Sequence, residues 1–66
     1  MVGKVVELIG SSPNNWTEAV NNAVHKADQT IDEITGVEVT GFTADIKNGV
    51  VTDYKANIHL AFGVRR

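Results

Sequence analysis

The sequence predicts an α+β fold with the element order β-α-β-β, in which one helix packs across one face of a small sheet. Three observations favour it: a short β-branched run at residues 5–9, apolar residues at helical spacing from residue 16 onward, and two β-rich stretches joined by Asn48-Gly49. A chain of 66 residues has room for one domain only, which we expect to span residues 1–66.

The first strand is expected at residues 5–9, because β-branched residues favour strands and the turn-forming residues 10–13 end the run. Asn15 and Glu18 have the spacing of a capping box, which predicts a helix that starts near Trp16. Apolar residues then recur every three or four positions; they are Trp16, Ala19, Val20, Ala23, Val24, Ala27, Ile31 and Ile34. This stripe predicts a helix of about 19 residues, about 29 Å long. Trp16, at its first position, is expected to fix the helix to the sheet.

The second strand is expected over residues 36–46, and Asn48-Gly49 after it is the strongest short sequence signal for a hairpin. The third strand alternates most clearly, with these apolar residues on one side: Tyr54, Ala56, Ile58, Leu60, Phe62 and Val64. Lys55, Asn57 and His59 lie on its other side, which a single helix leaves uncovered. We expect Asn57 and His59 to contact a ligand or another subunit.

The small size of the chain and its lack of cysteine limit the ways in which it can be stabilised. A chain this small buries only about 60% of its unfolded surface, and without cysteine it has neither a disulfide nor a Cys-ligated zinc to stabilise it. Self-association is therefore expected.

The net charge of −2 argues against nucleic-acid binding, and no apolar run approaches the roughly 20 residues that cross a membrane. The start lacks the features of a signal peptide, so we expect a cytoplasmic protein. No nucleophile motif or phosphate-binding loop is present, so we expect no enzyme activity.

Several stretches of the chain resemble the dodecin family. They are VELIGSS at residues 6–12, WTEAVNNA at residues 16–23, IKNGVV at residues 46–51, and the closing strand at residues 54–62. The resemblance covers nearly the whole chain. It implies a three-stranded antiparallel sheet wrapped around one long helix, in a subunit of a hollow homododecamer that binds small ligands and performs no chemistry.

The same resemblance implies a flavin site that is altered here. Family members hold the flavin ring against a tryptophan at the start of the second strand, and a glutamine on the third strand hydrogen-bonds to it. These positions correspond to Gly36 and Lys55 in this sequence. Glycine offers no ring on which a flavin would stack, and lysine donates hydrogen bonds but accepts none. FMN, FAD or riboflavin is therefore expected to bind weakly or not at all.

Calcium is the alternative ligand. Asp32 and Glu33, near the end of the predicted helix, carry the carboxylate oxygens that Ca²⁺ prefers. The symmetry of a shell would multiply these oxygens, and dodecin-like proteins without the flavin tryptophan have been associated with calcium. The sequence thus leaves two alternatives: a shell that binds a small ligand, and a shell that binds calcium or is purely structural.

Overall fold

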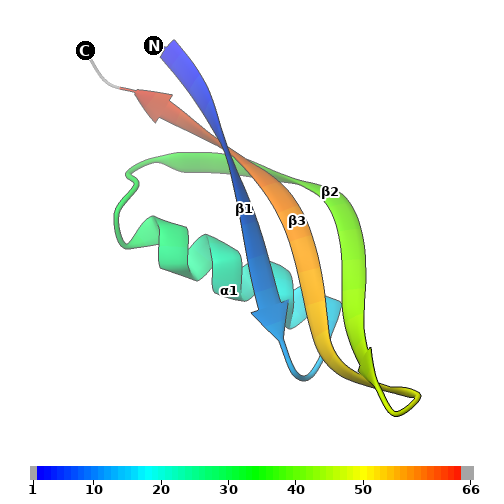
Figure 1. The fold of residues 1–66 in the computed structure, drawn as a ribbon. Helices are drawn as coiled ribbons and strands as arrows, with labels where there is room; N and C mark the ends of the chain where they lie inside the picture. Colours follow the sequence, from blue (N-terminus) through cyan, green and yellow to red (C-terminus); the bar gives the residue numbers. More distant parts are fainter. Residues whose placement is uncertain (1, 65–66) are drawn as a thin grey trace.

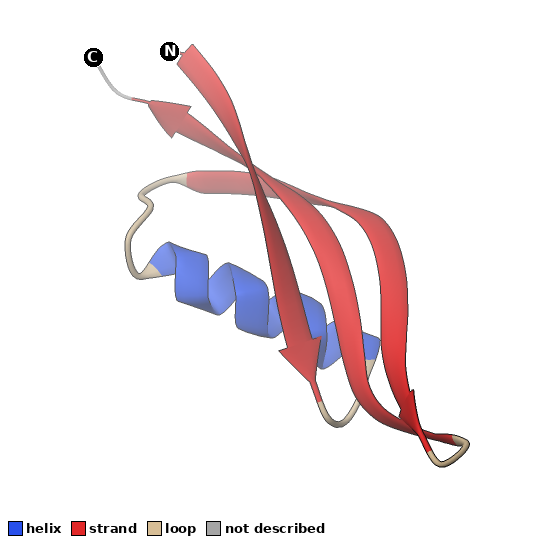
Figure 2. Ribbon diagram, viewed as in Figure 1, coloured by secondary structure: helices blue, strands red, loops and turns tan. Residues whose placement is uncertain are grey.

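The computed structural model describes residues 2–64, with the surroundings of the side chains described for residues 5–63. Its elements are β1 (Val2–Ser12), α1 (Trp16–Asp28), β2 (Ile34–Lys47) and β3 (Val50–Val64), which confirms the order β-α-β-β (Figure 1). The three strands form one antiparallel sheet in the order β1-β3-β2. The strands twist and bend over a single helix that lies on one side of the sheet (Figure 2).

The core lies between α1 and the middle strand β3. Its buried apolar residues are all at most 6% exposed, and they are Ala19, Ala23, Ala27, Ala56, Ile58 and Leu60. Alternate residues of β3 face the helix, as predicted. Alanines let the helix approach the sheet so closely that a Cβ on Gly10 would lie 2.7 Å from the Ala23 Cβ and overlap the Ala19 carbonyl oxygen. The distance between helix and sheet therefore requires glycine at position 10.

The start of α1 is held by a small hydrogen-bond network. The Asn15 side chain accepts from the Glu18 backbone N–H at 2.6 Å, as the capping-box spacing predicts. The Ser12 hydroxyl, only 1% exposed, donates to the Glu18 carboxylate at 2.6 Å and accepts from the Asn14 backbone N–H at 2.9 Å. The hydrogen bond from Ser12, and after it that from the Asn14 side chain, lowers the pKa of the Glu18 carboxyl below its ordinary value.

Trp16 connects the start of α1 to the two strands of the hairpin. Its indole N–H donates to the Thr43 backbone oxygen at 2.9 Å. Its ring packs edge-on against Tyr54, with the ring centroids 4.8 Å apart. These contacts confirm the prediction that Trp16 fixes the helix to the sheet.

The predicted bounds of β1 and α1 are wrong. β1 extends from Val2 to Ser12, because the residues on both sides of 5–9 still pair with β3. α1 has 13 residues rather than about 19. Beyond it the Ile31 N–H bonds to the Ala27 oxygen at 2.9 Å, and Glu33 adopts a left-handed φ of 58°, so the chain reverses into β2. Ile31 and Ile34 continue the helical spacing in sequence, yet they reach the core from the loop and from β2.

The β2–β3 hairpin is confirmed at Asn48 and Gly49, whose φ angles of 53° and 76° are those that two-residue hairpin turns require. This hairpin extends past the start of α1 (Figure 1). The helix packs on β1 and β3 and contacts β2 little. No helix within residues 2–64 is long and apolar enough to cross a membrane.

Candidate ligand-binding site

The side of the sheet that faces away from α1, here called the outer face, carries most of the predicted site residues. Because directly paired residues of antiparallel strands share a face, the ladder defines its members. They are Val5, Glu7, Ile9 and Ser11 of β1, Gly36, Glu38, Gly41, Thr43 and Asp45 of β2, and Asp53, Lys55, Asn57, His59 and Ala61 of β3. No element among the described residues covers this face (Figure 2).

A depression of about 310 Å³ opens beside Gly36, where β2 passes β3. Its lining is Val5, Gly36, Val37, Glu38, His59 and Ala61. A Cβ added at Gly36 would meet no atom within 4 Å, so the backbone there borders open space. Apolar walls with a carboxylate and an imidazole at the rim suit a small ligand held by non-covalent contacts.

His59 lies between two carboxylates that come from the two neighbouring strands. Its Nε2 is 3.5 Å from Glu7 Oε2, and its Nδ1 is 3.6 Å from Glu38 Oε1. Glu7 and Glu38 both pair directly with His59 in the ladder, so the register aligns all three. Both contacts are longer than an ordinary hydrogen bond. His59 therefore lies beside Glu38 in the lining of the depression.

Lys55 and Asn57 lie further along β3 on the same face and do not line the depression. The Lys55 ammonium forms an ion pair at 3.0 Å with Asp45, which lies on the neighbouring strand β2. Asn57 pairs with Ile9 on one side and Gly41 on the other. Of the four predicted ligand positions, the structure thus places Gly36 and His59 together and puts Lys55 and Asn57 beside them.

Asp32 and Glu33 lie in the loop between α1 and β2 and not at the end of the helix, because the helix ends at Asp28. The Gly63 backbone N–H donates to the Glu33 backbone oxygen at 3.2 Å, which joins this loop to β3. Within the described part of the chain, no cluster of three or more His, Cys, Asp or Glu side chains has the arrangement of a metal site.

Sequence reasoning missed Glu7 and Glu38 as partners of His59. Strand alternation places Glu7 on the same side of β1 as Val5 and Ile9, but it does not indicate which strand β1 pairs with. The pairing of β1 with β3 joins residues more than 40 positions apart, such as Glu7 and His59. The sequence indicates this pairing only if β3 is already known to be the middle strand of the sheet.

The fold and the outer face define a small β-α-β-β binding module with an uncovered sheet face. The dodecin family model matches residues 2–65, and the chain belongs to this family. The predicted family and fold class are confirmed.

Relatives of known structure support the assignment. A dodecin from Streptomyces coelicolor superposes with a TM-score of 0.95 at 32% identity, over 98% of this chain and 93% of that one. The calcium dodecin of Mycobacterium tuberculosis is 28% identical over 64 residues, which are 97% of this chain and 90% of that protein. A crystal structure described as this calcium dodecin with a novel calcium-binding site gives a TM-score of 0.87 at 29% identity, over 98% of this chain and 93% of that one. Dodecins are small binding proteins that form homo-oligomers.

Proposed function

We propose that this chain forms a single domain over residues 1–66 that assembles into a cytoplasmic, non-enzymatic homododecamer. In this proposal the shell binds, stores or buffers a small ligand at the outer face of the sheet. The depression beside Gly36 and the uncovered outer face support the ligand-binding part. The membership of a homo-oligomeric family supports the assembly.

The altered flavin site is the central part of the proposal, and the open space at Gly36 is the observation that carries it. With no side chain there, a flavin loses an aromatic surface that contributes about 0.5–1.5 kcal/mol beyond its buried area. Lys55 cannot replace an amide, because its ammonium accepts no hydrogen bond and is already paired with Asp45. We therefore expect FMN, FAD and riboflavin to bind weakly or not at all.

The experiment introduces an aromatic ring at position 36, where the flavin would stack. Riboflavin fluorescence is titrated with wild type, Gly36→Trp and the control Gly36→Leu, which adds apolar area without an aromatic face. Because a Cβ at Gly36 meets no atom within 4 Å, all variants should fold. We expect Gly36→Trp to bind riboflavin roughly 2–12-fold more tightly than Gly36→Leu, which is the stacking contribution expressed as affinity. Addition of Lys55→Gln should strengthen binding further.

Two results would contradict this proposal. Tight riboflavin quenching by wild type would mean that the flavin site is intact. A light-scattering mass near the 7.1 kDa of one subunit would refute the proposed homododecamer.

A calcium-binding or purely structural shell is the second candidate, favoured by the similarity to the calcium dodecin of Mycobacterium tuberculosis. Asp32 and Glu33 are its proposed ligands, repeated by the symmetry of the assembly. Calorimetry with Ca²⁺ should give heat with wild type and less heat with Asp32→Asn or Glu33→Gln, while Mg²⁺ serves as the comparison ion. Heat that neither substitution changes would exclude both residues as calcium ligands. The absence of any heat would exclude calcium binding and favour the purely structural shell.

A further inference from the structure

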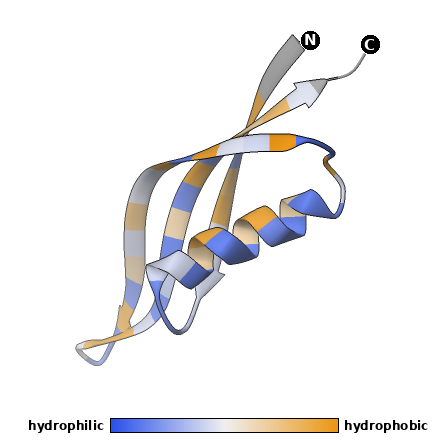
Figure 3. Ribbon diagram, turned by 180° about the vertical axis from the view of Figure 1, so that it is seen from behind, coloured by the Kyte–Doolittle hydropathy of each residue, from blue (hydrophilic) through white to orange (hydrophobic). Residues whose placement is uncertain are grey.

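The polar rim of the depression beside Gly36 carries negative charge. Hydrophilic and hydrophobic segments alternate along β3 (Figure 3), and the alternation places His59 on the outer face between Glu7 and Glu38. Two carboxylates beside a neutral imidazole give a charge of −2, and beside a protonated imidazole they give −1. The rim is therefore negative in either state of His59.

The outer face supplies no permanent cation close enough to neutralise this charge. Lys55 is the one lysine or arginine among the outer-face residues, and its ammonium is paired with Asp45 at 3.0 Å. It lies four positions from His59 on β3, which is about 13 Å along the strand. This separation exceeds the screening length of about 8 Å at physiological salt. Glu7 and Glu38 therefore remain available to a cation from solution.

The hydrogen-bonding groups at the depression select the same kind of ligand. A carboxylate accepts hydrogen bonds and donates none, and the side chains of Glu7 and Glu38 are 68% and 75% exposed, so a ligand can reach them. Thr35, next to Gly36, could supply a donor, but its hydroxyl already donates to the Ala61 backbone oxygen at 3.1 Å. A ligand that brings N–H donors matches this rim.

The rest of the lining is apolar and fits a flat ring system. Val5, Val37 and Ala61 line the depression, and the backbone at Gly36 borders open space. Its volume of about 310 Å³ lies at the lower end of the range for small-molecule pockets, about 300–1,000 Å³.

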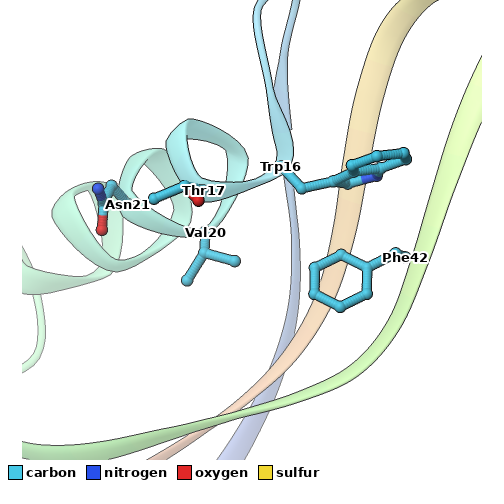
Figure 4. A pocket seen from close by; sticks show the side chains of 5 residues that line it. All are labelled: Trp16, Thr17, Val20, Asn21 and Phe42. Atoms are coloured by element: carbon cyan, nitrogen blue, oxygen red, sulfur yellow. The ribbon is translucent and has the colours of Figure 1, made fainter.

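A second depression, of about 560 Å³, provides a contrast (Figure 4). It lies where the start of α1 faces β2, and its lining contains no charged residue: Trp16, Thr17, Val20, Asn21 and Phe42. Both depressions offer apolar surface, so the carboxylates are what distinguishes the depression beside Gly36.

We propose that the depression beside Gly36 takes organic cations, namely small molecules with a flat apolar body and a protonated amine or amidinium group. The body lies on the open backbone at Gly36, and the cationic group faces Glu38 and Glu7. The inference rests on the proposed ligand site at the outer face and names the class of ligand that this site takes.

The test compares two fluorescent three-ring probes of similar size, proflavine, which is a cation at neutral pH, and acridone, which is uncharged. Each is titrated against wild type, Glu38→Gln, Glu7→Gln and the control Asp53→Asn. Asp53 also lies on the outer face, but it is six positions from His59 on β3, about 20 Å along the strand. All three substitutions change the net charge equally, so only the position of the lost carboxylate differs.

We expect wild type to bind proflavine more tightly than acridone. An exposed ion pair contributes little, so Glu38→Gln and Glu7→Gln should each weaken proflavine binding by roughly 1.4–5-fold. Asp53→Asn should leave the affinity for proflavine unchanged, and no variant should alter acridone binding. Added salt should reduce the preference for proflavine, because exposed charges are screened. Circular dichroism on each variant checks that the fold is kept.

The outcomes separate this inference from the proposed function. If neither probe binds, the ligand site on the outer face is refuted, and the inference with it. Equal binding of both probes would leave the site intact and overturn the preference for cations. Proflavine binding that Asp53→Asn weakens as much as Glu38→Gln does, or that neither glutamate substitution weakens, would place the cation elsewhere and also overturn the inference.

Discussion

Substitution of Gly10 by alanine is expected to destabilise the fold strongly, because β1 touches the helix at this residue. The added Cβ would overlap the carbonyl oxygen of Ala19 and lie 2.7 Å from the Cβ of Ala23. Neither atom belongs to a flexible side chain, so the helix or the strand has to move. Overpacking a core costs about 1–3 kcal/mol, and two rigid contacts place Gly10→Ala near the upper end. At 4–8 °C per kcal/mol for a domain of this size, about 3 kcal/mol lowers the Tm by roughly 12–24 °C.

The assay is thermal and urea unfolding followed by circular dichroism, at one protein concentration because association shifts apparent stability. Gly36→Ala is the matched control, since its Cβ would meet no atom within 4 Å. The control should leave the free energy of unfolding unchanged or raise it slightly, because alanine restricts the unfolded chain. Equal stability of the two variants would show that the close approach at Gly10 does not limit the packing of the helix.

Three further outcomes are expected. Trp16→Phe should lose about 1 kcal/mol of unfolding free energy, the usual contribution of one hydrogen bond, because its indole N–H donates to Thr43; an unchanged urea midpoint would contradict this. Gly49→Ala should cost about 1 kcal/mol, because alanine disfavours a φ of 76°, and replacing Gly36 again serves as control in the same assay. The pKa of Glu18 is lowered in the fold from an ordinary value of 4.5, so its stabilisation is present above about pH 4.5 and is lost as the pH falls through the folded value. Tm measured from pH 7 to pH 3 should therefore fall less steeply in Glu18→Gln than in wild type; parallel curves would exclude the Glu18 hydrogen bonds as the cause.

Local signals predicted most of the fold. The capping residues around Trp16, the hairpin turn and the alternation of β3 each depend on neighbours in sequence, and the structure has all of them. The end of α1 was mispredicted because Ile31 and Ile34 keep the helical spacing although the chain has already turned. The reversal depends on the left-handed backbone of Glu33, and glutamate gives no sequence warning of that conformation.

The candidate site could be predicted only in part. Alternation alone placed Asn57 and His59 on the uncovered side of β3. The two glutamates beside His59 depend on the register of three strands, and the exposure of Phe42 depends on where α1 lies across the sheet. Both are long-range properties, and no short stretch of the sequence encodes them.

The sheet order β1-β3-β2 has a consequence for how the chain folds. The strand in the middle of the sheet is the last of the four elements along the chain. β1 therefore lacks its partner strand until β3 has been synthesised, and until then its backbone N–H and C=O groups are not paired with those of β3. The hairpin between β2 and β3 can close locally, whereas β1 joins by closing a loop of about 40 residues, which is the slower event. We expect hairpin formation to precede the docking of β1, so that folding ends with the strand that was made first.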